Sequence, residues 1–275
     1  MDYEALRKKA NDIRIDIIKS VYSAGSGHPG GSLSAADIFT VLYFNEMNID
    51  PKNPGMKGRD KFVLSKGHAS PGIYSTLAER GFFPKEDLVT FRKMGSKLQG
   101  HPDRNKVPGI EMSTGSLGQG LSAAVGMALT NKLDKDPGRV YVLVGDGELQ
   151  EGLVWEAFMA AAHFKLDNLT VIVDWNGLQI DGKNDDVMSV TPIDEKLKGF
   201  GWEVVTIDGH DLEEISGAFA KARECKDKPF AIIARTIKGK GVSFMENEFG
   251  WHGKAPNEEQ FKQALEELEK LGGEL

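Results

Sequence analysis

The chain has 275 residues, of which 40% are hydrophobic and 27% charged, and its formal net charge is −7. This is the composition of an ordinary globular protein. The acidic balance argues against a general binder of nucleic acid or of anionic membranes, because both need concentrated positive charge. Cys225 is the only cysteine, which excludes an intrachain disulfide.

No apolar run approaches the ~20 residues of a membrane span. The first residues mix acidic and basic side chains and lack the apolar core of a signal peptide. We therefore expect a cytoplasmic protein with no membrane and no nucleic-acid partner.

Helical periodicity begins at the N-terminus, where apolar residues from Leu6 to Val21 predict a helix over 3–24. Further helices are expected at 32–47, 70–81, 84–95, 118–133, 154–165, 211–224 and 256–271. A strand is expected to begin at 61 and run into a glycine turn, and others are expected at 139–144, 168–175, 201–208 and 229–236. The alternation predicts a doubly wound α/β fold, with a mostly parallel sheet and helices on both faces. With no linker or repeat, residues 1–275 are expected to form one domain.

Polar residues follow two of the expected strands. Gly145-Asp146-Gly147 ends the first, and Asn176 ends the second, thirty positions after Asp146. In such sheets ligands bind beyond the carboxyl ends of the strands. An aspartate and an asparagine there are suitable ligands for Mg²⁺ on a diphosphate, and Gly147 would let the backbone approach a phosphate. The alternative is a purely structural Asp-Gly turn.

Histidines and glycines gather in the same loops. Four of the six histidines lie in glycine- or proline-bearing segments: His28, His68, His101 and His252. Imidazoles exchange protons near neutral pH, which suits catalysis on hydroxyl groups. The other two histidines are interpreted as a structural residue on a helix (His163) and a surface-loop residue (His210). Lys66 and Arg92 are interpreted as ordinary surface charges.

Nine sequence segments, in this order along the chain, indicate one protein family: SGHPGGSLSAADI, RDKFVLSKGHASPGIYSTL, GFFPKEDL, LQGHPD, STGSLGQGLSAAVGMAL, GDGELQEGLVWEA, VDWNGLQIDG, TIKGKGV and WHGKAPN. From about residue 9 to 257 the chain resembles the transketolase family, whose cofactor is thiamine diphosphate. Two positions depart from common family patterns. Ser116 stands where many members have proline, and HPGGS has glycine where some members have a hydroxyl residue.

The resemblance implies a role for each matching residue. The metal, Mg²⁺ or alternatively Ca²⁺ or Mn²⁺, would be bound by Asp146, the Asn176 side chain and the Leu178 carbonyl. The rest of the cofactor would be bound by Asn176, Gly147, His68, Lys238, His252, Gly115, Ser116 and Leu117. Catalytic contacts to the reacting carbon and the sugar would come from His28, His101 and His252. Glu151 and Glu156 match acids at the contact between family protomers, with solvated helix acids as the alternative.

The resemblance covers the diphosphate-binding half of the family only. It implies the N-terminal subunit of a split transketolase, which transfers a two-carbon ketol unit from a ketose phosphate to an aldose phosphate. No block matches the pyrimidine-binding half, with its catalytic glutamate and phosphate-binding arginines. We therefore expect the partner to be a transketolase C-terminal subunit, with two copies of each chain in the assembly.

Three other functions remain open. A related ketol transferase, such as a dihydroxyacetone synthase, would share these motifs. The α subunit of a 2-oxoacid dehydrogenase also carries a separate diphosphate half, but SGHPG and QGHPD are transketolase-like. The third is a non-catalytic protein that binds thiamine diphosphate.

Overall fold

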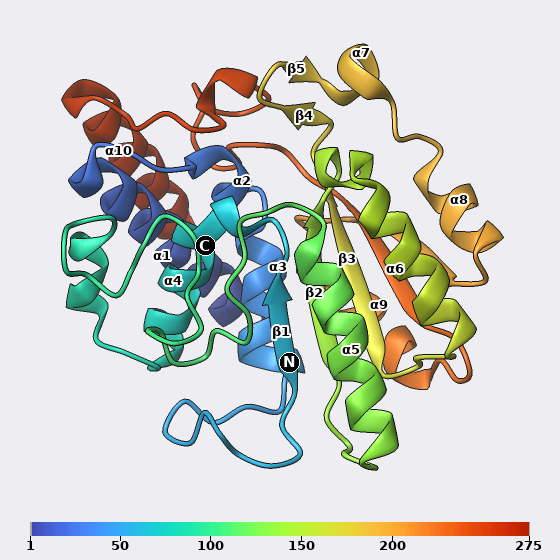
Figure 1. The fold of residues 1–275 in the computed structure, drawn as a ribbon. Helices are drawn as coiled ribbons and strands as arrows, with labels where there is room; N and C mark the ends of the chain where they lie inside the picture. The colour runs from blue at the N-terminus through green and yellow to red at the C-terminus, as the bar shows by residue number, and fades with distance from the viewer. Residues whose placement is uncertain (1, 275) are drawn as a thin grey trace.

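A five-stranded parallel sheet forms the centre of the chain in the computed structural model, which describes residues 2–274 (Figure 1). The strand order is β1-β2-β3-β7-β6. The strands are β1 (Lys61–Leu64), β2 (Val140–Gly145), β3 (Leu169–Trp175), β7 (Phe230–Arg235) and β6 (Glu203–Asp208). Every neighbouring pair in this sheet is parallel, which confirms the predicted α/β class.

Alternate side chains of each strand enter two different cores. On β2, Tyr141 and Leu143 pack on one face, while Val142 and Val144 pack on the other. Both faces are apolar because helices cover both, as is usual in parallel sheets. The first core includes residues of α1 (Tyr3–Ala24), α3 (Ala36–Val41), α4 (Ser70–Arg80) and α9 (Leu212–Glu224). The second includes residues of α5 (Gln119–Leu133), α6 (Gly152–His163) and α8 (Ile193–Gly199), with α5 and α6 in front of the sheet in Figure 1.

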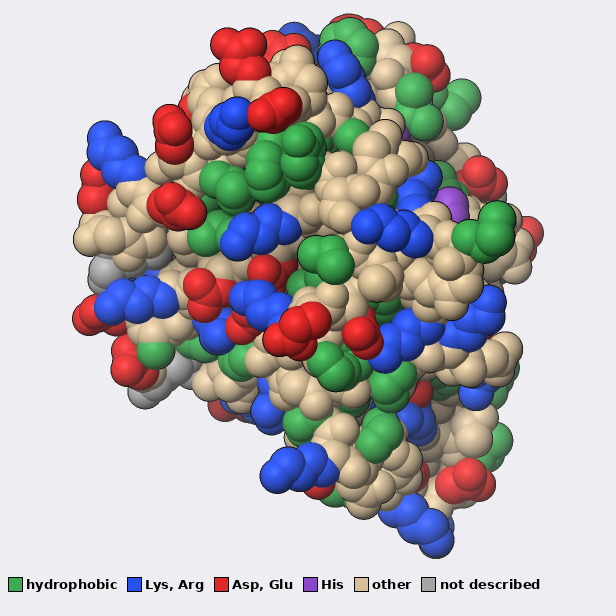
Figure 2. Space-filling view, turned by 90° about the vertical axis from the view of Figure 1, so that its left-hand side faces the viewer, with side chains coloured by type: hydrophobic (Ala, Val, Ile, Leu, Met, Phe, Trp, Pro, Cys, Tyr) green, Lys and Arg blue, Asp and Glu red, His purple; other side chains and the backbone are tan. Residues whose placement is uncertain are grey.

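A third core joins the two ends of the described chain. Helix α1 begins where the Asp2 side chain accepts a hydrogen bond from the Ala5 N–H at 3.0 Å. Its residues Ile13 and Ile17 share this core with Leu268 of α10 (Glu258–Glu274). Figure 2 shows this side of the molecule, where acidic and basic side chains are interspersed. None of the described helices has a stretch long and apolar enough to span a bilayer.

Two predicted helices are wrong in detail. The helix expected over 32–47 is divided into α2 (Pro29–Leu33), α3 and a π-helical turn (Leu42–Glu46). Proline favours the first position of a helix, so α2 begins at Pro29. The Ser34 hydroxyl between α2 and α3 donates to Asp174 at 2.6 Å. Only a 3₁₀ helix, Lys85–Thr90, forms within the second segment, 84–95.

The segment after β3 carries structure that no pattern indicated. It forms a short antiparallel hairpin of β4 (Leu178–Gln179) and β5 (Gly182–Lys183), then α7 (Asn184–Met188) and α8. The Asn184 N–H donates to the Gly177 carbonyl at 2.9 Å. The hairpin thereby returns the chain to the end of β3.

Candidate active site

Asp146 lies buried at the carboxyl end of β2, beside the end of β3. Its Oδ1 accepts from the Gly147 N–H at 2.8 Å, and its Oδ2 accepts from the Gly177 N–H at 2.5 Å. Burial, together with the nearby Asp174 carboxylate, raises the pKa of Asp146 to about 6. The chain continues into a 3₁₀ helix (Gly147–Gln150) and α6, so Gly145-Asp146-Gly147 is not the turn of a β-hairpin.

The loop after β3 brings further oxygen atoms to the same place. Asn176 Oδ1 accepts from the Leu178 N–H at 3.2 Å, and Asn176 Nδ2 lies 3.4 Å from Asp174 Oδ2. The Leu178 carbonyl accepts from Lys238 Nζ at 3.1 Å. The hydrogen bond from Gly177 to Asp146 holds this loop against β2. A carboxylate, a side-chain amide and a backbone carbonyl therefore meet at one edge of the sheet, and all three are oxygen donors of the kind a hard cation takes.

A cavity of about 330 Å³ opens at this edge. Most of the residues expected to bind the cofactor or the metal, or to act in catalysis, line it: His28, His68, Gly115, Leu117, Asp146, Gly147, Asn176, Leu178, Lys238 and His252. Ser116 and His101 are not among the lining residues. Gly115 has φ +148°, and a side chain there would meet the His101 ring at 3.0 Å, so only glycine fits this loop against the histidine.

The four loop histidines form one cluster, although they come from distant parts of the sequence. Ring centroids are 5.3 Å apart for His28 and His68, 5.4 Å for His28 and His252, and 4.9 Å for His68 and His252. His101 is more exposed, and its ring lies 6.4 Å from that of His28.

Burial lowers the pKa of these imidazoles, and nearby cations lower it further. The pKa of His28 falls to about 4, with Arg92 as the next cause, and that of His252 falls to about 3, with Lys238 as the next cause. The pKa of His68 lies well below its usual range, chiefly through burial and Lys66. The three imidazoles are therefore neutral at neutral pH and can each donate and accept a hydrogen bond.

Two basic residues expected on the surface belong to this region instead. Lys66 is only 2% exposed and forms an ion pair with the fully buried Asp174. Arg92 is partly buried, and it donates to the Ser26 hydroxyl at 2.7 Å. Both interpretations as ordinary surface charges are wrong, because the partners that bury these side chains are remote in sequence.

Lys238 lies in the same region, as the resemblance implied. It is 2% exposed. Burial and the neighbouring Lys66 lower the pKa of Lys238 to about 8. Two buried ammonium groups therefore stand beside the cavity.

Glu148 is a site residue that the sequence analysis did not single out. Its buried carboxylate accepts from the Ser65 hydroxyl at 2.5 Å, the Gly118 N–H at 2.8 Å and the Gly145 N–H at 3.0 Å. It thus joins the ends of β1 and β2 to the glycine loop before α5. The only signal was its place two residues after Asp146.

The remaining predicted acids and histidines differ in where they lie relative to the site. Glu151 lines the cavity, and both Glu151 and Glu156 are exposed in this chain. His163 ends α6 and is exposed, away from the cluster. His210 was expected on the surface, but its side chain is only 13% exposed. Its Nδ1 lies 2.8 Å from Asp37 Oδ2, and its Nε2 accepts from the Ile237 N–H at 2.8 Å.

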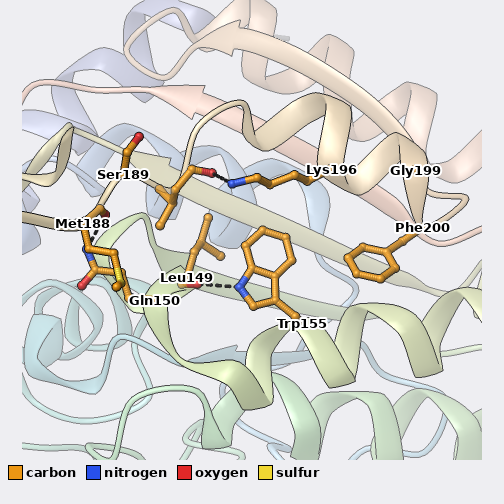
Figure 3. A pocket seen from close by; sticks show the side chains of 9 residues that line it. Leu149, Gln150, Trp155, Met188, Ser189, Lys196, Gly199 and Phe200 are labelled. Atoms are coloured by element: carbon orange, nitrogen blue, oxygen red, sulfur yellow. Dashed lines mark hydrogen bonds between the residues drawn. The ribbon is translucent and has the colours of Figure 1, made fainter.

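A second cavity, of about 480 Å³, lies beyond the 3₁₀ helix that follows Asp146 (Figure 3). Its walls include Leu149, Trp155 and Phe200. The Trp155 indole donates to the Leu149 carbonyl at 2.7 Å, and Lys196 Nζ donates to a backbone carbonyl at 2.7 Å. These polar groups are already paired within the wall, so this cavity has less to offer a ligand than the first.

Comparison with known proteins agrees with this geometry. Residues 6–272 match the family described as "Transketolase, thiamine diphosphate binding domain". The chain is 46% identical to the 6-deoxy-6-sulfo-D-fructose transketolase subunit SqwG of Clostridium sp. (strain MSTE9), covering 97% of each chain. It is 43% identical to an apulose-4-phosphate transketolase subunit of Phocaeicola vulgatus, covering 98% of this chain and 95% of that one.

Longer relatives match over part of their length. The chain is 44% identical to Homo sapiens transketolase, over 96% of this chain but 42% of that protein. It superposes on the crystal structure of Campylobacter jejuni transketolase with a TM-score of 0.92 and 38% identity, over 98% of this chain and 43% of that one. The chain therefore belongs to the transketolase family, as an N-terminal subunit of the split form that carries the thiamine diphosphate-binding domain.

Proposed function

We propose that the chain binds thiamine diphosphate and a divalent cation, and that with a partner chain it transfers a two-carbon ketol unit between sugar phosphates. The observation that carries this proposal is the meeting of Asp146, Asn176 and the histidine cluster around one cavity. Relatives that match along their whole length are transketolase subunits named for different ketoses.

The residues around the cavity fit the diphosphate and its cation. Asp146, the Asn176 side chain and the Leu178 carbonyl would hold the cation. We propose Mg²⁺, because all three ligands are oxygen atoms. The ammonium group of Lys238, the His68 imidazole and the backbone N–H of Gly147 would face the diphosphate charge. His252 Nδ1 is buried and has no hydrogen-bond partner among the described residues, as expected of an atom that contacts a ligand.

Three histidines of the cluster would transfer protons to and from the sugar. Thiamine diphosphate supplies the nucleophilic carbon chemistry of ketol transfer when it is bound. His28, His101 and His252 stand together, and the first and last are neutral at pH 7. Each can accept a proton from one sugar hydroxyl or donate one to a forming hydroxyl. Gly115, Ser116 and Leu117 would line the aminopyrimidine side of the cofactor.

The active site would be completed by a second polypeptide. Matches to longer transketolases cover about two fifths of their length, and two close relatives are named as subunits. We propose that the partner is a transketolase C-terminal chain, with two copies of each chain related by a two-fold axis. The exposed Glu151 and Glu156 would then lie at the contact between protomers. We also propose that the assembly works in the cytoplasm.

Reconstitution tests the proposal. The chain is used to capture its partner from native extract, and both are then purified separately and mixed. Transfer from a ketose phosphate donor to an aldose phosphate acceptor is expected for the mixture only, and only with both thiamine diphosphate and Mg²⁺. A screen of donors distinguishes a transketolase from a dihydroxyacetone synthase. Cofactor binding without turnover of any sugar would support a non-catalytic binding protein instead.

A further inference from the structure

His210 joins helix α3 to the loop that carries Lys238. Its Nδ1 lies 2.8 Å from Asp37 Oδ2, and its Nε2 accepts from the Ile237 N–H at 2.8 Å. An imidazole nitrogen that accepts a hydrogen bond carries no proton, so the proton of this ring is on Nδ1 and is donated to Asp37. The two neighbours of His210 thereby select one tautomer.

The His210 side chain is itself held in place. Asp37 is 6% exposed, and it also forms an ion pair with the buried Arg14 of α1. The segment before His210 is attached to the end of β7, because the Gly209 N–H donates to the Arg235 carbonyl at 2.7 Å. A water molecule could also accept from the N–H that His210 binds, but it would not be held in one position by α1, α3 and β7.

The backbone of Lys238 is fixed on both sides. Ile237 precedes it, and the Gly239 N–H, which follows it, donates to the Gly30 carbonyl of α2 at 3.0 Å. The Lys238 side chain then extends past Gly30, where an added carbon atom would lie 3.1 Å from Lys238 Cγ. The position of the ammonium group at the cavity therefore depends on where the backbone of this loop is held.

This loop has to hold its cation against repulsion from another one. Lys66 and Lys238 are each 2% exposed, and burial followed by the Lys66 charge lowers the pKa of Lys238. Two like charges in one buried region favour any loop conformation that moves Lys238 outward. A loop that moved outward would have to be ordered again when an anion binds, and this ordering would reduce the affinity.

We propose that His210 is a positioning residue for the diphosphate site: by accepting from the Ile237 N–H, it keeps the Lys238 ammonium group at the cavity before the cofactor binds. The inference rests on the proposed function, in which Lys238 faces the diphosphate. His210 does not line that cavity, so it acts only through the loop.

Two substitutions separate the acceptor from the rest of the imidazole. The amide of glutamine reaches the place of Nε2, so His210→Gln can still accept from the Ile237 N–H. The amide of asparagine reaches only the place of Nδ1, so His210→Asn can still donate to Asp37 but leaves that N–H unpaired. Calorimetric titration of the full-length chain with thiamine diphosphate and Mg²⁺ measures the effect. We expect His210→Asn to raise Kd about threefold to tenfold, and His210→Gln to raise it less than about twofold.

A double-mutant cycle distinguishes a positioning role from a purely structural one. In the Lys238→Met background, His210→Asn should change Kd by less than about twofold, because the group that it positions is absent. Asn168→Ala is the control. It removes a hydrogen bond of 2.9 Å to the Ala128 carbonyl, and Asn168 lies just before β3, at the opposite end of the sheet from the cavity. This control should lower the denaturation midpoint and keep wild-type affinity.

Nitrogen NMR of the wild-type chain with isotope-labelled histidine tests the tautomer without any substitution. We expect His210 to carry its proton on Nδ1 and none on Nε2 at neutral pH without cofactor. The inference is overturned by a proton on Nε2, by wild-type affinity in His210→Asn, by equal losses in the two His210 variants, or by an equal loss from His210→Asn in both backgrounds. The proposed function stands in each of these cases. Failure of the wild-type chain to bind the cofactor, alone and with its partner, would overturn both.

Discussion

Replacing Lys66 with methionine should destabilise the fold strongly, because it breaks an ion pair that water does not reach. The side chains of Lys66 and Asp174 are 2% and 0% exposed. Lys66 Nζ also donates to the Gly31 carbonyl at 2.8 Å. Asp174 accepts from the hydroxyls of Ser34 and Thr236 as well. The pair thus connects β1, β3, the end of β7 and the α2 region.

The expected loss follows from this burial. Removing one partner of a buried ion pair typically costs ~3–5 kcal/mol, since the other charge is left uncompensated. Methionine fills a similar volume, so little of the cost would come from a cavity. The two hydroxyl donors remain on Asp174 and offset part of the lost attraction. We therefore expect Lys66→Met to lower the free energy of unfolding by about 2–4 kcal/mol.

Denaturant titration at pH 7.5, followed by circular dichroism, measures this quantity. Lys198→Met is the matched control, because Lys198 and Asp194 form an i,i+4 pair with side chains 57% and 39% exposed. Exposed pairs of this kind contribute only ~0.3–0.5 kcal/mol. If Lys66→Met costs no more than Lys198→Met, the reasoning that burial makes this pair strong is refuted.

Three other results are expected. Asp146→Ala should abolish Mg²⁺-dependent binding of thiamine diphosphate in calorimetry while the chain stays folded, and wild-type affinity would disprove the metal role. His252→Ala should lower kcat/KM of the assembled enzyme by about 10²–10⁴, with unchanged circular dichroism, and a loss below about threefold would make it a bystander. Burial holds the pKa of His28 at about 4 and that of His252 at about 3, below the ordinary 6.5. At a pH between 6.5 and these lowered values, the unfolded chain therefore binds more protons than the folded chain. The free energy of unfolding should therefore fall as the pH drops from about 6.5 toward 4, and it should fall more steeply in the wild type than in His28→Gln. If denaturant titrations give the two proteins the same dependence of this free energy on pH, the prediction is contradicted.

Strong periodicity made the helices and strands of the sheet predictable. The predicted bounds of α1 are those observed, and β2 and β3 were found within one residue because continuous apolar runs mark strands buried on both faces. The hairpin of β4 and β5 was missed because two-residue strands leave no periodic pattern.

The grouping of the candidate site residues around one cavity was predictable where family motifs matched. The burial of single charged side chains was misread where it depends on remote partners. Lys66 stands in a polar, glycine-bearing segment, and only Asp174, more than a hundred residues later, makes it a buried ion-pair partner. His210 is held in the same way by Asp37, from a helix far earlier in the chain.

The pairing of β3 with β7 has a consequence for how the chain acquires its structure during synthesis. Strand β3 ends at Trp175, but its second neighbour in the sheet begins only at Phe230. A ribosome must therefore add more than fifty further residues before the central strand is flanked on both sides, and the last proposed site residue, His252, emerges later still. Such distant pairings slow folding, because long loops must close before their contacts form. Until then the edge of β3 is open to other unpaired strands, so the nascent chain should depend on chaperones most between the synthesis of β3 and that of β7.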